Sequence, residues 1–430
     1  MKTLKPVLIS ALIAAALLSG CKKDDTEQVT IEFMHSSVEQ ERQAVISQLI
    51  ARFNKENPQI TVKQVPVEED AYNTKVITLA RSGALPEVIE VSHDYAKVMD
   101  KEQLIDRDAI KTVVGQVGEN NFYDGVLRIV RTEDGSAYTG VPISAWLGGV
   151  WYRKSALKEA GIGEPKNWTE LLNAARIMTH ADDKKYGIAL PTAESVMTEQ
   201  TFSQFALSNG ANVFNAAGEV TVNSPEMLAS LNYYRDLAQY TMPSSNDVME
   251  IKDAFMNGTT QMAFYSTYIL PAFYKEGTPQ DLGFVVPTEK SAAVYGMLTS
   301  LTITAGQSEA ETKAAEKFIA FMEQPQNSAD WVLMSPGAAL PTTRQVVETA
   351  SYKENPVIQA FGSLPSELIA QYPNVQVFGS VGEKNFTRMG DITGSAILSE
   401  MVNKTTVGKQ PTDSALDNSQ QRIVELMKQR

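Results

Sequence analysis

Polar side chains that could bind a ligand or a metal lie at the ends of two predicted strands. His35, Ser36 and Ser37 close the strand predicted over residues 29–35, and His93 and Asp94 follow the strand predicted over residues 88–91. In an open α/β sheet, ligands bind just outside the carboxyl ends of the strands. These two groups are therefore expected either to share a ligand cleft or to serve as ordinary polar loops.

Each group keeps an alternative structural role. Ser36 or Ser37 can cap the helix that follows, with Gln40 completing a capping box. The same segment offers free N–H groups and two hydroxyls to a polar ligand. Asp94 either caps the next helix or accepts hydrogen bonds from a hydroxyl-rich ligand. A metal site would need more ligands in a fixed geometry, and no carboxylate–histidine spacing supplies them.

Common enzyme motifs are absent from the sequence, including G-x-S-x-G, G-x-G-x-x-G, the Walker loop and H-E-x-x-H. The segment "SALK" (155–158) matches the S-x-x-K pattern of penicillin-binding enzymes, but the companion motifs are missing. We interpret it as the start of a helix capped by Ser155. The sequence thus predicts no catalytic residue, no metal and no cofactor.

Aromatic residues give a second chemical signal. Trp146 lies in "ISAWLGG", Tyr265 and Tyr268 frame "YSTYIL", and Tyr295 precedes Gly296. Sugar rings present an apolar C–H face that stacks on aromatic planes, while their hydroxyls need donors and acceptors. The alternative for each tyrosine is core packing with a satisfied hydroxyl.

The elements that must position these residues alternate between strands and helices. Strands are predicted over residues 29–35, 59–67 and 88–91, with an amphipathic helix after each. This order favours a parallel α/β sheet. Residues 141–153 predict a strand, a glycine pair and a second strand. Further helices are predicted from Glu309 to Met322, capped by Ser308, and over residues 414–429.

The amino terminus predicts export. Lys2 and Lys5 precede an apolar run from Val7 to Leu18, followed by small residues, which is the order of a secretory signal. The run is shorter than the roughly 20 residues of a spanning helix. Cys21, the only cysteine, excludes an internal disulfide. "KKDDTEQ" after it reads as a flexible tether.

Composition restricts the partners. The chain of 430 residues has a formal charge of −13, which becomes −15 when Lys2 and Lys5 are removed with residues 1–20. An acidic protein of this kind argues against nucleic acid or anionic lipid as a partner. The length exceeds what a single core supports, so two domains are expected.

Several segments, in this order along the chain, resemble the family 1 extracellular solute-binding proteins, the sugar-type binding proteins of ABC importers. "LSGC" is similar to the bacterial lipobox, in which the signal is cut before a cysteine that then carries acyl chains. The other matching segments are "IEFMHSS", "ARFNKENPQITVKQV", "LARSGALPEVIEVSHDYA", "GVPISAWLGGVWYRKSALKEAGIGEPKNWTELL", "AFMNGTTQMAFYSTY" and "VGKQPTDSALDNSQQRI".

This resemblance implies a two-lobed α/β fold of the periplasmic-binding-protein type II, similar to the maltodextrin-binding protein, with a hinge between the lobes. The chain would cross between lobes near 140–142, 287–296 and 336–341. It implies a signal peptide (1–20), a lipidated tether (21–28), an N-terminal lobe (29–139 with about 288–338) and a C-terminal lobe (140–287 with about 339–430).

The resemblance also implies a set of ligand-binding positions in the cleft. Trp146 stands where the maltodextrin member has a carboxylate, which leaves the size and register of the ligand open. Arg388 has the alternative of capping a helix end. The implied ligand-binding residues are His35, Ser36, Ser37, Asp94, Trp146, Glu199, Tyr268, Gly296, Met297 and Arg388, and Cys21 is the implied lipidation site.

Three hypotheses about function follow. The preferred one is a lipid-anchored, monomeric receptor, facing the periplasm or the outer surface, that captures a sugar or glycoside and delivers it to an ABC permease. The second is a secreted glycoside hydrolase, for which Asp94 and Glu199 are the only plausible carboxylate pair. The third is a scaffold lipoprotein without a sugar-sized cleft.

Overall fold

The structure is a computed structural model that describes residues 28–429. Its main sheet is mixed, with strand order β2-β1-β3-β7-β4-β5, and β6 pairs with β4. The predicted signal peptide, Cys21 and nearly all of the tether lie outside the described residues. The strands are β1 (Val29–His35), β2 (Ile60–Pro66), β3 (Val88–Ser92), β4 (Val141–Arg153), β5 (Met262–Ser266), β6 (Leu282–Val285) and β7 (Gly296–Ile303), and β8 (Ser380–Val381) pairs with β9 (Lys384–Asn385) in a separate hairpin.

The first strands and helices alternate as predicted. β1 pairs in parallel with both β2 and β3, and α1 (Gln40–Glu56), α2 (Glu69–Ser82) and α3 (His93–Lys101) follow them in turn. Gly83 ends α2 in the left-handed conformation, with φ of 66°. Glycine adopts this conformation without strain because it has no Cβ, and helices commonly end at such a residue.

The predicted cap of α1 was wrong. The helix begins at Gln40 after Glu39, and no side chain caps it. Ser36 instead donates its backbone N–H to Glu90 Oε2 at 2.8 Å and its hydroxyl to the same oxygen at 3.3 Å. The carboxylate of the neighbouring strand therefore holds the segment between β1 and α1.

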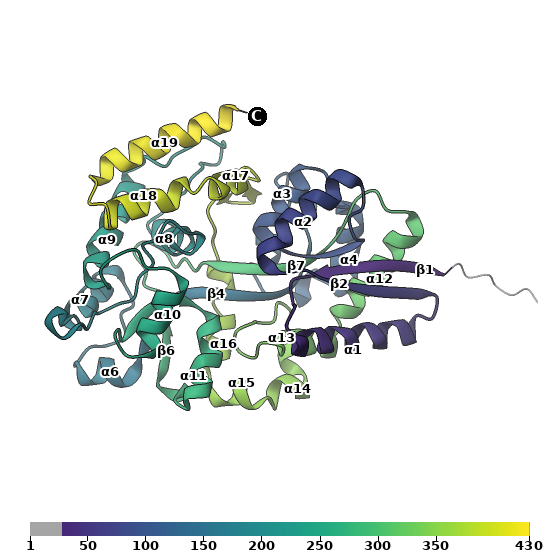
Figure 1. The fold of residues 1–430 in the computed structure, drawn as a ribbon, viewed down its shortest axis with the longest axis horizontal. Coiled ribbons are helices and arrows are strands. Elements are labelled where there is room, and N and C mark those ends of the chain that lie inside the picture. Colours follow the sequence, from purple (N-terminus) through teal and green to yellow (C-terminus); the bar gives the residue numbers. More distant parts are fainter. Residues whose placement is uncertain (1–27, 430) are drawn as a thin grey trace, which may run out of the picture.

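β4 is one continuous strand, although the sequence predicted two strands separated by a glycine pair. Residues 141–147 pair with β7, and residues 148–153 pair with β5 and β6. At Gly149 a Cβ would lie 2.4 Å from a ring carbon of Phe284. The glycine thus permits close packing within the strand. β4 and β7 run between the two halves of the molecule (Figure 1).

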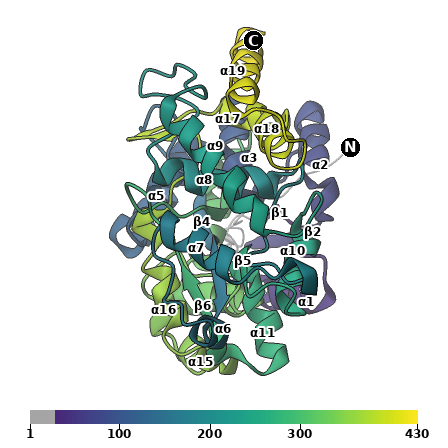
Figure 2. The same ribbon diagram turned by 90° about the vertical axis from the view of Figure 1, so that its left-hand side faces the viewer.

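Helices cover the two halves of the sheet. On the N-terminal side, α12 (Glu309–Met322) contacts β1 and α4 (Arg107–Val117), and Ser308 with Glu311 forms the predicted capping box. On the other side, α8 (Val196–Ser208) is buried along most of its length and contacts α9 (Pro225–Leu237) and α18 (Ile397–Thr406). Figure 2 shows this second group of helices from the front.

The remaining helices surround these layers. α19 (Thr412–Lys428) packs on α18 and ends the described chain. No helix within residues 28–429 combines the length and the apolar character that a membrane span requires. The other helices are α5 (Val126–Ile129), α6 (Lys154–Glu159), α7 (Trp168–Ile177), α10 (Val248–Met256), α11 (Leu270–Glu276), α13 (Pro325–Val332), α14 (Ala350–Lys353), α15 (Pro356–Ala360), α16 (Leu364–Ile369) and α17 (Met389–Gly394).

Two buried hydrophobic clusters form the core. One surrounds α8 and includes Phe202, Phe205 and Tyr234. The other begins at β1 and β3 and continues along β4 to Phe255 and Phe273. Since this cluster follows β4 across the molecule, the strand joins the two halves through packing as well as through hydrogen bonds.

Candidate ligand-binding site

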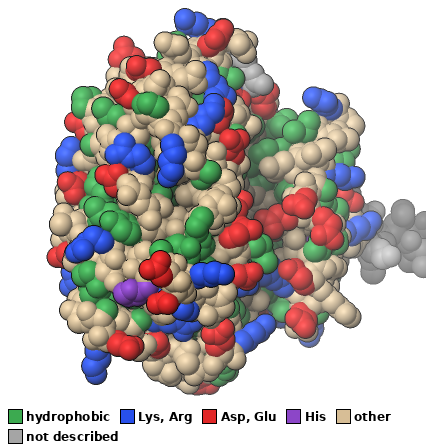
Figure 3. Space-filling view, turned by 60° about the vertical axis from the view of Figure 1, so that its left-hand side comes forward, with side chains coloured by type: hydrophobic (Ala, Val, Ile, Leu, Met, Phe, Trp, Pro, Cys, Tyr) green, Lys and Arg blue, Asp and Glu red, His purple; other side chains and the backbone are tan. Residues whose placement is uncertain are grey.

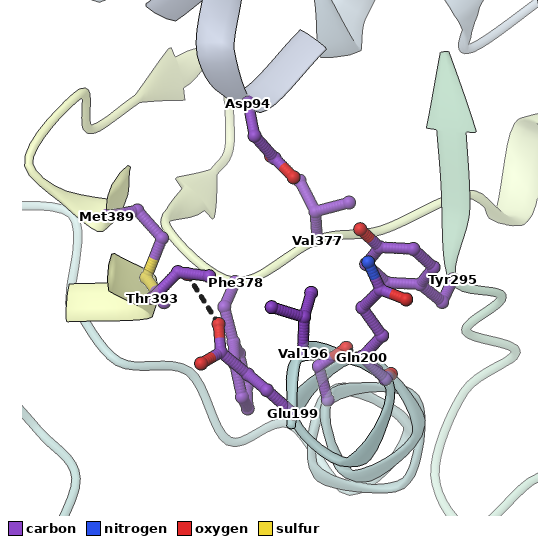
Figure 4. A pocket seen from close by; sticks show the side chains of 10 residues that line it. Asp94, Val196, Glu199, Gln200, Tyr295, Val377, Phe378, Met389 and Thr393 are labelled. Carbon is purple, nitrogen blue, oxygen red and sulfur yellow. Dashed lines mark hydrogen bonds between the residues drawn. The ribbon is translucent and has the colours of Figure 1, made fainter. Parts of the chain in front are cut away.

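Two adjoining cavities lie where the two halves of the molecule meet, and Figure 3 shows a groove between a larger and a smaller part. The smaller cavity, here called the acidic pocket, has a volume of about 20 Å³. A water molecule needs roughly 10–15 Å³ measured in this way, so the pocket accommodates one group of that size. Its lining residues are Asp94, Val196, Glu199, Gln200, Ser203, Tyr295, Val377, Phe378, Met389 and Thr393 (Figure 4).

The larger cavity, here called the aromatic chamber, has a volume of about 260 Å³. It shares Val196, Gln200 and Tyr295 with the acidic pocket, so the two cavities adjoin. The chamber is lined by Trp146, Gly148, Val196, Met197, Gln200, Thr201, Val248, Phe264, Tyr265, Ser266 and Tyr295.

Asp94 enters the acidic pocket from the first turn of α3. Ser92 caps this helix by accepting the N–H of Tyr95 at 3.3 Å, so Asp94 is not the cap. Directly beside it, His93 is fully buried, and its Nε2 lies 2.9 Å from Asp94 Oδ1. The N–H of Leu298 donates to His93 Nδ1 at 3.2 Å. The imidazole proton therefore lies on Nε2, toward Asp94.

The charge of Asp94 is strongly favoured. Burial opposes ionisation most strongly, but His93, Lys97 and the Tyr295 hydroxyl together outweigh it, so the pKa of Asp94 falls to about 2. A permanent carboxylate thus faces the acidic pocket from the N-terminal half of the molecule.

Glu199 faces the same pocket from α8, on the opposite wall from Asp94 (Figure 4). Its residue surface is 6% exposed, and the Thr393 hydroxyl donates to Oε1 at 2.6 Å. Burial, with repulsion from Asp94, raises the pKa of Glu199 to about 7 despite the bond from Thr393. The pocket therefore holds two carboxyl groups whose pKa values differ widely.

The aromatic chamber is walled by rings from three strands. Trp146 comes from β4, Phe264 and Tyr265 from β5, and Tyr295 immediately precedes β7. The rings of Trp146 and Tyr295 lie 5.6 Å apart at 44°. Val196 and Val248 line the chamber and are 52% and 42% exposed, so its mouth lies on their side.

The charged side chains that line the two cavities are all acidic. Among the described residues that line the two cavities, the charged side chains are Asp94 and Glu199, and none is Lys, Arg or His. Lys97 on α3, which does not line either cavity, is buried and interacts with Asp94 electrostatically. The surface offered to a ligand therefore attracts hydrogen-bond donors and disfavours anions.

The structure places the β1 segment outside both linings. His35 is fully buried, and its Nε2 lies 3.3 Å from Gln64 Oε1. Burial lowers the pKa of His35. Ser36 is bound to Glu90, as described above, and Ser37 is buried. These predicted ligand residues are thus not brought together with Asp94 and Glu199.

The other predicted residues are divided between the cleft and its surroundings. Met297 pairs with Trp146 across β4 and β7, and Gly296 pairs with Leu147. Neither β7 residue lines the two cavities, nor does Tyr268, which is 41% exposed. Arg388 donates to the carbonyls of Leu426 and Met427 at the end of α19, which matches its predicted alternative role as a helix cap.

Seven residues that line the acidic pocket were not named from the sequence: Val196, Gln200, Ser203, Val377, Phe378, Met389 and Thr393. Gln200 directly follows Glu199 in α8, so its position next to a predicted ligand-binding residue could have indicated it from the sequence. Thr393 lies 194 positions away from Glu199 in the chain. No local pattern links it to the site, and only the tertiary fold brings α17 to α8.

The raised pKa of Glu199 predicts a pH dependence of stability. Its folded value of about 7 exceeds the ordinary 4.5, so the folded state holds the proton more tightly than the unfolded chain. This stabilisation is fully present below about pH 4.5 and is lost as the pH rises to about 7. The shift corresponds to about 3 kcal/mol.

We expect Glu199→Gln to remove this dependence, because the amide keeps the shape but does not titrate. The variant should gain stability relative to the wild type by about 3 kcal/mol between pH 4.5 and 7.5. Urea unfolding at several pH values measures this, with Glu159→Gln, at an exposed position of α6, as the control. Parallel curves for wild type and Glu199→Gln would contradict the raised pKa.

Comparisons with known proteins show the family of the chain. The sequence model of the bacterial extracellular solute-binding proteins matches residues 36–329. The chain is 69% identical over 425 residues to the "Putative ABC transporter periplasmic-binding protein YcjN" of Escherichia coli K12, and the match covers 99% of both chains. It is 26% identical over 373 residues to the sn-glycerol-3-phosphate-binding periplasmic protein UgpB of Shigella dysenteriae, covering 81% of this chain and 82% of that one.

A solved structure shows the same fold. The sugar-binding protein MalE from Xanthomonas citri superposes with a TM-score of 0.77 at 21% identity, over 93% of this chain and 98% of that one. The predicted two-lobed fold of the maltodextrin-binding type is therefore confirmed. From the family model and the identity over the full length, the chain belongs to the bacterial extracellular solute-binding proteins.

Proposed function

We propose that the protein is the substrate-binding lipoprotein of an ABC importer and that it captures an uncharged sugar or glycoside. The observation that carries this proposal is the pair of carboxyl groups, Asp94 and Glu199, that faces one small pocket from opposite halves of the molecule. A carboxylate accepts hydrogen bonds from hydroxyl groups. The name of the 69% identical relative supports the importer role.

The aromatic chamber supports a sugar-like body for the ligand. Trp146, Tyr265 and Tyr295 line this cavity with aromatic rings, and the two tyrosines also carry hydroxyl groups. A sugar ring stacks its C–H face on such rings and points its hydroxyls at polar groups. In this arrangement the body of the ligand fills the chamber, and one hydroxyl reaches the acidic pocket past Gln200 and Tyr295.

The proposed mechanism is closure of the two lobes around the ligand. A ligand that contacts Asp94 on one lobe and Glu199 on the other has more contacts in the closed state, so it favours that state by its differential affinity. We propose the lobe boundaries predicted above, with residues 29–139 and about 288–338 in the N-terminal lobe. The closed, monomeric protein would then deliver the ligand to the permease.

A saccharide panel read by thermal unfolding tests the ligand class. We expect an uncharged mono- or oligosaccharide to raise the melting temperature, since binding to the native state stabilises it by mass action. Glycerol 3-phosphate, which UgpB is named for, should give no shift, because no Lys, Arg or His is among the described residues that line the two cavities. Thermal shifts confined to glycerol 3-phosphate, amino acids or peptides would contradict the sugar assignment.

The same panel tests the role of the acidic pocket. Asp94→Asn should weaken the binding of the active sugar by about tenfold or more, because hydrogen bonds to charged groups contribute about 1.5–3 kcal/mol. Asp413→Asn, at an exposed position in α19, is the matched control and should bind as the wild type does. Equal affinities for the two variants would place the ligand elsewhere.

A second candidate function is glycoside hydrolysis. The pair of one low and one raised pKa at Asp94 and Glu199 is the pattern that lysozyme-type enzymes use for a nucleophile and an acid. The prediction that separates the candidates is the turnover of 4-nitrophenyl glycosides. The receptor proposal expects none, whereas turnover that either Asp94→Asn or Glu199→Gln abolishes would establish the enzyme.

Membrane attachment through Cys21 is the last part of the proposal. A single acyl chain binds a membrane only weakly and reversibly, whereas two acyl chains on the cysteine would anchor the protein stably. Cys21→Ser should therefore release the protein from the membrane fraction while leaving its sugar affinity unchanged, as fractionation and titration would show. Loss of binding in the released protein, or its retention on membranes, would contradict the anchor.

A further inference from the structure

The aromatic chamber changes in character with distance from the acidic pocket. Val196, Gln200 and Tyr295 line both cavities, so they mark the end of the chamber that adjoins the pocket. The other lining residues belong to the chamber alone and are here called the outer chamber: Trp146, Gly148, Met197, Thr201, Val248, Phe264, Tyr265 and Ser266. None of these residues carries a charge, in contrast to the two carboxyl groups of the acidic pocket.

The small hydroxyl groups of the outer chamber already form hydrogen bonds within the protein. Thr201 donates its hydroxyl to the carbonyl of Met197 at 2.8 Å, one turn earlier in α8. Ser266 Oγ accepts the N–H of Tyr268 at 3.4 Å. Each hydroxyl therefore keeps only part of its hydrogen-bonding capacity for a ligand. The rest of the outer chamber is formed mainly by apolar and aromatic side chains.

The mouth of the chamber is apolar because two helices begin there. Val196 and Met197 lie in the first turn of α8, and Val248 lies in the first turn of α10. Ser195 donates its hydroxyl to Asp247 Oδ1 at 2.9 Å, and this bond joins the residues that precede the two helices. Apolar side chains that are exposed at the edge of a cavity gain free energy when a ligand covers them.

A second sugar ring would be poorly matched to the outer chamber. Each sugar hydroxyl that loses water without gaining a protein partner costs free energy. A flat aromatic group has no such hydroxyls and gains by leaving water. Trp146 offers a ring system on which it can stack, and the flexible thioether of Met197 packs favourably against aromatic rings.

We propose that the ligand is a glycoside with an aromatic aglycone, its non-sugar group, and that the aglycone occupies the outer chamber. The sugar ring then lies beside Gln200 and Tyr295, with one hydroxyl in the acidic pocket. Met249, the next residue after Val248, is 61% exposed and adds apolar surface beside the mouth. This inference rests on the proposed sugar-binding function of the cleft and names the class of its ligand.

Paired glycosides test the aglycone. The protein, unfolded and refolded to remove bound ligand, is titrated calorimetrically with the methyl and 4-nitrophenyl pyranosides of D-glucose, D-galactose and D-mannose, in both anomeric forms. For the sugar that binds, we expect the 4-nitrophenyl glycoside to bind about tenfold or more tightly than the methyl glycoside, as burial of an aromatic group predicts. Equal affinities within every pair would overturn the inference.

A substitution at the mouth tests where the aglycone lies. Val248→Thr nearly keeps the shape of the side chain but adds a hydroxyl, so it should weaken the 4-nitrophenyl glycoside by about threefold and leave the methyl glycoside unchanged. Val407→Thr, at a 39% exposed position that ends α18, is the matched control and should leave both affinities unchanged. An equal loss for the two glycosides, or no loss for either, would contradict the proposed position.

Disaccharides distinguish an aromatic aglycone from a second sugar ring. Maltose, cellobiose and lactose carry a sugar in place of the nitrophenyl group, and we expect each to bind more weakly than the corresponding 4-nitrophenyl glycoside. A disaccharide that binds as tightly would overturn the aromatic aglycone, while the sugar-receptor proposal would stand. Absence of binding by every glycoside and every saccharide would overturn both.

Discussion

Backbone hydrogen bonds along β4 connect the two halves of the molecule, and the cleft depends on their register. Residues 141–147 of β4 belong to the ladder with β7, and residues 148–153 belong to the ladders with β5 and β6. Trp146 lies at the change of partner, opposite Met297. A shift of one residue would turn Trp146 to the other face of the sheet and remove the main wall of the aromatic chamber.

The same ladder connects the chamber to the acidic pocket. Leu298, two residues into β7, donates its N–H to His93, and the remaining proton of His93 faces Asp94. A backbone contact therefore sets the tautomer of His93 and thereby supports the charge of Asp94. At Glu199, burial and repulsion from Asp94 outweigh the hydrogen bond from Thr393, the one side-chain donor to this carboxyl group among the described residues, so its pKa is about 7. The contrast between the two acids follows from their number of donors and from burial.

Much of the fold could be predicted from sequence because the signals are local. Strand alternation and helical periodicity located β1 to β3 with their helices, and Ser308 with Glu311 marked the start of α12. Asp94 could be found because strand ends of an α/β sheet are known binding positions. These features depend on residues a few positions apart.

The features that sequence analysis missed depend on distant residues. The glycine pair of β4 suggested a break, but Phe284 packs against Gly149 and the strand continues. Ser36 was expected to cap a helix, yet Glu90 of another strand competes successfully for its N–H and hydroxyl. Thr393 reaches Glu199 only through the packing of α17 near α8. In each case a tertiary contact overrides the local preference.

The most direct test of the central claim is a crystal structure of the protein bound to the small molecule that it captures from a cell extract. We expect density for an uncharged sugar-like ligand whose body contacts Trp146 in the aromatic chamber and whose terminal hydroxyl lies between Asp94 and Glu199. Ligand density beside His35 and Tyr268 instead, with both carboxyl groups out of contact, would contradict the assignment of the cleft.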